Sequence, residues 1–126
     1  MSFELDRVRL TIGERNLLSR LKSSTGIDNW NVFARWALCY SIGKTSEINL
    51  NEEDGDYGIE MTWVVFGGKN YKIYQDLLIK ECQRLNLKIT KTNLNLILRA
   101  HLRNGIKQIF TQTKSLDDLF KLTDVA

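Results

Sequence analysis

The sequence predicts a mainly α-helical fold that opens with one short strand. Apolar residues follow helical patterns in four segments, at about residues 12–25, 30–42, 70–86 and 91–110. The 126 residues include no proline, so these helices can run without interruption. Clear alternation of polar and apolar side chains is found at residues 7–11, where it indicates a strand.

In this first strand, Arg7, Arg9 and Thr11 are expected on one face, with Val8 and Leu10 on the other. A strand of this length is not stable alone, so it requires a partner strand and a core beneath its apolar face.

The first helix, residues 12–25, is predicted to bury leucines and to expose a basic side. Arg15, Ser19 and Lys22 are spaced to form a line along its surface, while Arg20 and Lys22 stand at the two borders of the polar side. Gly26 is suited to ending the helix, and Asp28 to capping the N-terminus of the next one.

The second helix, residues 30–42, is apolar on all sides, and Arg35 is its only charged residue. We expect Arg35 to pair with an acid or to cap backbone oxygens, and we do not assign it to ligand binding. A helix that is apolar all round is buried all round, which in a chain this small indicates contact with a second subunit. The sequence therefore predicts a homo-oligomer.

The remaining chain is predicted to be an acidic loop at residues 45–58, an apolar run at 59–66 and two helices. The β-branched and aromatic content of the run favours a strand, and a short helix is the alternative. A helical turn is expected near residues 115–120. We interpret residues 1–126 as one domain with three parts, namely 1–45, 46–68 (acidic loop and short strand or helix) and a helical extension, 69–126.

The net charge of +3 hides a strong segregation of charge. Residues 1–45 contain seven Lys or Arg and four acids, residues 46–66 contain six acids and no base, and residues 67–126 contain eleven bases and five acids. Two basic regions on either side of an acidic one favour a polyanionic partner.

The order strand–helix–turn–helix is typical of ribbon-helix-helix DNA-binding proteins, in which strands of two chains pair into a ribbon that enters a DNA groove. The sequence thus predicts a ribbon-helix-helix-like N-terminal part with a C-terminal helical extension. Arg7, Arg9 and Thr11 could read base edges or touch phosphates only. The candidate DNA-binding residues are Arg7, Arg9, Arg15, Ser19, Arg20 and Lys22.

No catalytic residue, metal site or cofactor is predicted. The single histidine, His101, is interpreted as structural or surface-exposed, and Gly67-Gly68-Lys69 lacks the full phosphate-loop pattern. Cys39 and Cys82 lie in apolar patterns that favour small buried hydrophobes over a disulfide or a nucleophile. No apolar run has the length of a membrane span and the N-terminus lacks a signal peptide, so a cytoplasmic protein is expected.

Several segments together resemble the DndE family, the small E component of the bacterial Dnd system for DNA phosphorothioation. They span roughly residues 7–110, and the stretch from Glu60 to Gly68 is the most specific. The segments are Arg9-Leu10-Thr11, Leu18-Ser19-Arg20-Leu21-Lys22, Thr25-Gly26-Ile27 with Trp30-Asn31, Arg35-Trp36, Glu60-Met61-Thr62-Trp63 with Val65-Phe66-Gly67-Gly68, and His101-Leu102 with Gly105-Ile106.

The resemblance implies an accessory, non-enzymatic DNA-binding protein that prefers nicked double-stranded DNA and forms a homo-tetramer. It also implies partners in the modification complex: a cysteine desulfurase, an iron–sulfur protein and an ATPase-like protein. Two alternatives are a sequence-specific ribbon-helix-helix repressor or antitoxin, and a scaffold of the complex that does not bind DNA.

Overall fold

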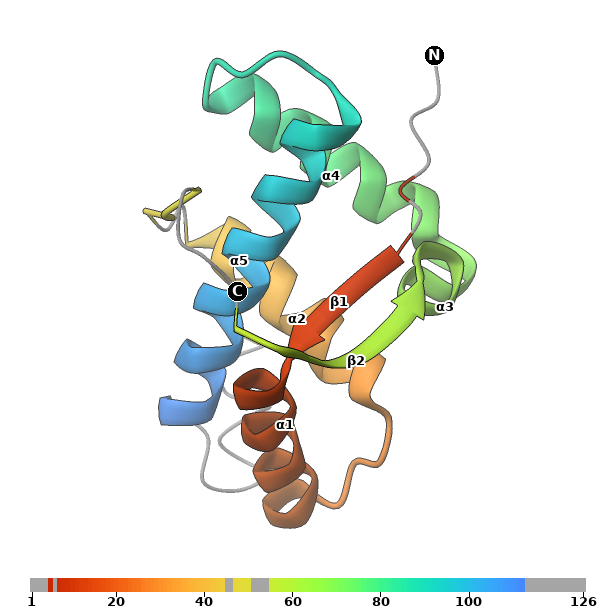
Figure 1. Ribbon diagram of the computed structural model, residues 1–126, viewed down its shortest axis with the longest axis vertical. Coiled ribbons are helices and arrows are strands. Elements are labelled where there is room, and N and C mark those ends of the chain that lie inside the picture. The colour runs from red at the N-terminus through yellow and green to blue at the C-terminus, as the bar shows by residue number, and fades with distance from the viewer. Residues whose placement is uncertain (1–4, 6, 45–46, 51–54, 113–126) are drawn as a thin grey trace.

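A computed structural model describes Leu5 and residues 7–44, 47–50 and 55–112. The elements, shown in Figure 1, are β1 (Arg7–Thr11), α1 (Ile12–Thr25), α2 (Trp30–Gly43), β2 (Tyr57–Thr62), α3 (Trp63–Gly67), the 3₁₀ turn η1 (Gly68–Asn70), α4 (Tyr71–Arg84) and α5 (Lys91–Gln112). The mainly helical fold and the four long helices are therefore confirmed. The turn expected near residues 115–120 and the acidic residues 51–54 lie outside the described residues.

β1 pairs antiparallel with β2 of the same chain, with Arg7 opposite Thr62 and Arg9 opposite Glu60. The two strands lie across the middle of the molecule, with α1 towards one end and α4 towards the other (Figure 1). The ribbon-helix-helix arrangement, in which the strand pairs with a second chain, is not confirmed. The apolar run predicted as strand or helix forms both, because β2 ends at Thr62 and the Thr62 hydroxyl accepts from Val65 N to begin α3.

Local capping explains where the first two helices begin and end. Gly26 ends α1 in the left-handed conformation, with φ of 77°, as the sequence predicts. The prediction for Asp28 is wrong: Asn29 is the N-cap of α2, and its side chain makes no capping hydrogen bond. Packing of α2 rather than a strong cap therefore determines where this helix begins.

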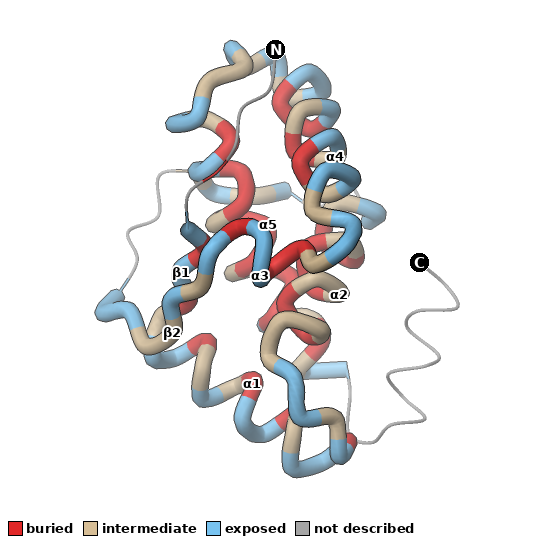
Figure 2. Tube along the Cα trace, turned by 90° about the vertical axis from the view of Figure 1, so that its right-hand side faces the viewer, coloured by how far each residue is buried: buried red, intermediate tan, exposed pale blue. Residues whose placement is uncertain are grey.

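The core is centred on the crossing of α2 and α5. A Cβ atom on Gly105 of α5 would lie 2.0 Å from the backbone oxygen of Ala37 in α2, so only glycine permits this close approach. Phe33, Ala37 and Leu38 are completely buried, and Figure 2 shows buried segments of both helices along this contact. α5 therefore supplies much of the burial of α2, whose other side is partly exposed in the chain. The predicted oligomer remains a prediction.

We predict that Gly105→Ala destabilises the protein by about 3 kcal/mol or more, because the new methyl group would push α5 away from the rigid backbone of α2. Gly43→Ala is the matched control, since a Cβ there meets nothing within 4 Å. Urea unfolding of both variants measures the difference. Equal stability of the two variants would contradict the close crossing.

Candidate nucleic-acid interface

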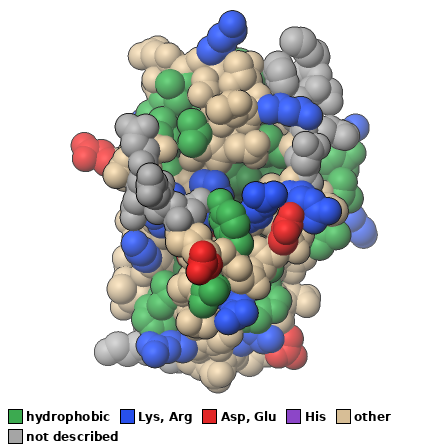
Figure 3. Space-filling model, in the orientation of Figure 1, with side chains coloured by type: hydrophobic (Ala, Val, Ile, Leu, Met, Phe, Trp, Pro, Cys, Tyr) green, Lys and Arg blue, Asp and Glu red, His purple; other side chains and the backbone are tan. Residues whose placement is uncertain are grey.

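Arg7 and Arg9 project from the outer face of β1, as the alternation predicts. Val8 and Leu10 are buried beneath them, at 1% and 0% exposure. The two arginine side chains are 56% and 49% exposed, and each contacts the same Oε1 atom of Glu60 on β2, at 3.1 and 3.5 Å. Basic side chains gather on this face over the two strands (Figure 3). One carboxylate shared by two guanidinium groups leaves this part of the surface positive.

Thr11 acts as a helix cap rather than as a third exposed group of this face. Its hydroxyl accepts from Glu14 N at 3.1 Å, and the Glu14 carboxylate accepts from Thr11 N at 2.9 Å. This capping box joins β1 directly to α1. Because the Thr11 hydroxyl accepts the hydrogen bond that caps α1, it is a poorer candidate than Arg7 or Arg9 for contact with a base edge.

The candidate residues of α1 fall into two groups. Arg15, Ser19 and Lys22 share one side of the helix, where Arg15 lies near Gly58 of β2 and the Nζ atom of Lys22 lies 4.7 Å from the ring centroid of Trp30. Arg20 lies on the other border, with its guanidinium 5.9 Å from the ring centroid of Phe110 in α5. Ser19 also lies beside Arg20, since these two residues line one shallow surface pocket with Ser23 and Ser24.

A cavity of about 470 Å³ lies between the sheet and α5. Arg7 and Arg9 line it together with residues that the sequence did not indicate as site residues: Tyr57, Asn95, Leu98 and Arg99. No local sequence pattern shows that Arg99, in the helix of residues 91–110, would meet the first strand. We call this feature the β1–α5 cavity.

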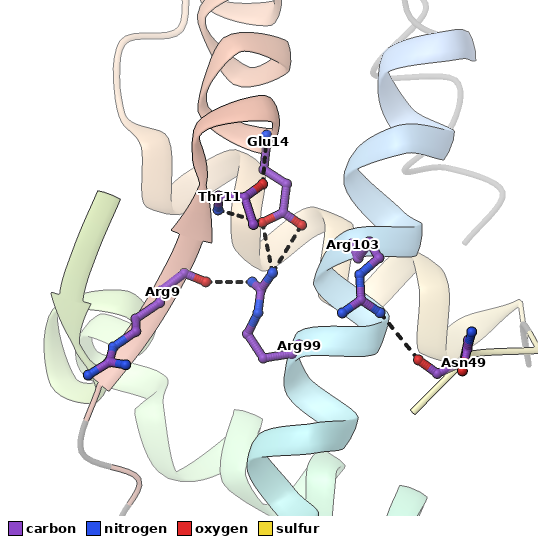
Figure 4. Close-up of polar contacts among 6 residues, drawn as sticks. All are labelled: Arg9, Thr11, Glu14, Asn49, Arg99 and Arg103. Carbon is purple, nitrogen blue, oxygen red and sulfur yellow. Dashed lines mark hydrogen bonds and ion pairs between the residues drawn. The ribbon is translucent and has the colours of Figure 1, made fainter. Parts of the chain in front are cut away.

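Arg99 connects α5 to both β1 and α1, as Figure 4 shows. Its guanidinium contacts the Glu14 carboxylate at 2.9 Å and donates to the backbone oxygen of Arg9. The Arg99 and Glu14 side chains are only 13% and 5% exposed, so this ion pair is largely desolvated. Removing either partner would leave a buried charge uncompensated, which identifies the pair as a structural element of the cavity wall.

His101 lies in a buried polar network that joins α2, α4 and α5. Its Nδ1 atom is 2.7 Å from Ser41 Oγ, and its Nε2 atom contacts the carboxylate of Glu81. Asn104 Nδ2 donates to Ser41 Oγ, and Arg84 forms a salt bridge with Glu81. The His101 side chain is completely buried, so it is not a surface residue, and its contacts fit the structural interpretation.

The protonation states follow from this network. Burial lowers the pKa of His101 below its ordinary value of 6.5, against the opposing influence of Glu81. The hydrogen-bonded guanidinium of Arg84 holds the pKa of Glu81 below 4.5. A neutral His101 can then donate from Nε2 to Glu81 and accept at Nδ1 from the Ser41 hydroxyl, so every polar group in the chain of contacts is satisfied.

The two cysteines and Arg35 also have structural environments that do not indicate reactivity. Cys39 and Cys82 are free thiols in the structure, and burial raises the pKa of both, which disfavours the nucleophilic thiolate. The Nε atom of Arg35 donates to the backbone oxygen of Asn31, which confirms the predicted capping of backbone oxygens. Within the described residues, no group of three or more His, Cys, Asp or Glu side chains is arranged to hold a metal ion.

Comparison with known proteins identifies the family. The model of the family described as DNA sulphur modification protein DndE matches residues 7–117. The chain belongs to the DndE family. The fold is similar to the crystal structure of DndE from Escherichia coli B7A, described as involved in DNA phosphorothioation modification, with a TM-score of 0.70 and 20% identity over 85% of this chain and 98% of the other.

No match was found among the curated proteins. The family assignment therefore rests on the family model, and the solved DndE structure shows the shared fold. Among the helices that the structure describes, none has the length and apolarity needed to cross a membrane.

We predict that the His101 network makes the stability of this DndE-family chain sensitive to acid. As pH falls below 6.5, the unfolded chain binds a proton at His101 that the folded chain resists, so stability falls by up to about 1.4 kcal/mol per pH unit until the folded pKa is reached. Glu81 adds a further loss below pH 4.5. Urea unfolding at intervals between pH 7.5 and 5 measures the first of these changes.

His101→Gln is the matched variant, because the sequence has a single histidine and glutamine keeps a donor near Glu81. We expect this variant to be less stable at pH 7.5 but to lose the slope between pH 7 and 5. A wild-type protein that becomes more stable on acidification would instead show that His101 is protonated in the fold.

Proposed function

We propose that this chain is an accessory DNA-binding protein of DNA phosphorothioation. In this proposal it acts in the cytoplasm and does not itself catalyse a reaction. It binds double-stranded DNA through phosphate contacts and prefers nicked duplex. The observation that carries the proposal is the DndE family match over residues 7–117. Physical support comes from the exposed guanidinium groups of Arg7 and Arg9 and from the basic side of α1, which carries Arg15, Ser19 and Lys22.

Phosphate contacts of this kind give affinity without sequence preference. Lysine and arginine that neutralise phosphates release condensed counterions, so binding weakens as salt rises. Arg20 contributes from the other border of α1. A nick adds backbone flexibility and exposed strand ends, and recognising them requires no catalytic residue.

The pairing of β1 with β2 of the same chain argues against a sequence-specific ribbon-helix-helix repressor. β1 pairs within its own chain, and Arg99 contacts the Arg9 backbone on the side away from β2 (Figure 4). A two-chain ribbon that reads bases would require rearrangement of these contacts. We therefore favour phosphate contact over direct readout of a base sequence.

We predict that the double variant Arg15→Ala with Lys22→Ala weakens binding to intact and nicked duplex and reduces the dependence of log K on log salt by about 2, one for each lost phosphate contact. Electrophoretic or fluorescence titration at several salt concentrations measures this change. Lys72→Ala with Lys80→Ala on α4 is the charge-matched control, because both lysines are exposed on another helix.

Unchanged affinity and salt dependence in the α1 variant would exclude these contacts. If wild-type protein binds none of intact, nicked or single-stranded DNA but co-purifies with the cysteine desulfurase, iron–sulfur protein or ATPase-like protein of the system, the chain is a scaffold instead. We propose those three proteins as partners in either case.

We also propose a homo-tetramer, for which the exposed apolar side chains Val64, Val65 and Ile73 on α3 and α4 offer contact area. Sedimentation of the purified chain is expected to give four times the monomer mass of 14.6 kDa. Val65→Glu is expected to shift the protein towards smaller species, because assembly would bury the new charge. A wild-type monomer at micromolar concentration would contradict the proposal.

A further inference from the structure

The β1–α5 cavity combines the groups that recognise a phosphate. Three arginines line it, Arg7 and Arg9 from the strand and Arg99 from α5, and Asn95 is a further polar lining residue. Guanidinium groups present several N–H donors in a planar fork that matches the oxygens of a phosphate. Leu98, which is 1% exposed, forms an apolar part of the wall.

The charges around the cavity leave it positive. Glu60 contacts both Arg7 and Arg9 through one carboxylate, and Glu14 pairs with Arg99. Three arginines therefore face two carboxylates. The side chains in the Glu60 contacts are 42–56% exposed, and such solvated ion pairs contribute little stability, so an incoming anion can replace them at small cost.

The wall of the cavity also has an aromatic surface. Tyr57 lines the cavity, and the guanidinium of Arg9 lies 5.3 Å from the centroid of its ring. Aromatic rings beside basic groups are typical of sites for single-stranded nucleic acid, because bases stack on them without sequence preference. The volume of about 470 Å³ falls within the range of about 300–1,000 Å³ found for small-ligand sites.

We propose that the β1–α5 cavity binds the 5′-phosphomonoester at the end of a DNA strand, with the terminal nucleoside against Tyr57. This inference rests on the proposed binding of nicked duplex, where such an end is exposed. A terminal phosphate carries about −1.5 to −2 charges at pH 7, as a phosphomonoester does on a protein side chain, whereas an internal diester carries one. A strand end can enter a concave site, whereas an internal phosphodiester has a nucleotide on both sides.

The first test uses thymidine 5′-monophosphate and thymidine as probes in an NMR titration of the full chain. The monophosphate is expected to shift the signals of Arg9, Asn95 and Arg99 in a saturable manner, and thymidine is expected to leave them unchanged. This arm does not depend on duplex binding. No saturable shift at these residues, or equal shifts at basic residues throughout the protein, would overturn the proposal.

Glu60→Gln provides a gain-of-affinity variant, because it removes the competing carboxylate while keeping the size of the side chain. We expect it to bind the monophosphate at least about threefold more tightly, and Arg9→Ala to bind at least about fivefold more weakly. Asn95→Ala is expected to weaken binding less than Arg9→Ala. Lys80→Ala on α4 is the control for loss of one exposed positive charge and should match wild type.

Nicked duplexes with either a 5′-phosphate or a 5′-hydroxyl at the break distinguish the strand end from a free nucleotide. Wild-type protein is expected to bind the phosphorylated nick at least about fivefold more tightly than the hydroxyl nick, and Arg9→Ala to lose that preference. Equal binding of the two nicks would overturn the strand-end assignment while leaving the proposed DNA-binding function intact. Failure of the proposed function would appear separately, as no binding to any duplex.

Discussion

The close contact between Gly105 and the backbone of Ala37 determines where the polar side chains of α5 lie. Because α5 crosses α2 without an intervening side chain, the residues that precede Gly105 are held near four other elements and the segment at Asn49. Arg99 reaches β1 and the start of α1, His101 reaches Ser41 and Glu81, and Arg103 donates to the backbone oxygen of Asn49. A wider separation of the two helices would alter all of these contacts together.

Two kinds of ion pair serve different purposes on the candidate interface. The Glu14–Arg99 pair is desolvated and holds α5 against the junction of β1 and α1, so its loss would disturb the fold. The contacts of Arg7 and Arg9 with Glu60 are exposed, and they compensate the two arginines only in part. The Glu14–Arg99 pair thus holds the elements of the interface in place. The Glu60 contacts can be replaced by contacts with another anion.

The buried histidine shows why residue type alone is a poor guide to chemistry. Ser41, His101 and Glu81 follow one another in hydrogen-bond contact, an order that is familiar from nucleophilic catalysis. Here Ser41 and His101 have no exposed surface, and Asn104 contacts the serine oxygen. The network satisfies buried polar groups where three helices meet.

The sequence could predict those features that depend on neighbours within a few residues. The periodicity of residues 12–25 and 91–110, the alternation that exposes Arg7 and Arg9, the left-handed cap at Gly26 and the capping role of Arg35 are all properties of this kind. Local backbone geometry and short-range hydrogen bonds decide them. The basic candidates of the strand and of α1 were found for the same reason.

Tertiary structure decided what depends on residues far apart in the chain. β1 pairs with a strand that begins 46 positions after it ends, and this pairing brings Tyr57 next to β1. Asn95 and Arg99 become neighbours of Arg7 and Arg9 only when α5 packs against the rest of the fold. Neither periodicity nor charge identifies such neighbours, because the energy of packing side chains from distant segments selects them. The sequence by itself determined the helices and the exposed basic residues, and the packing of α5 determined the cavity that these residues share.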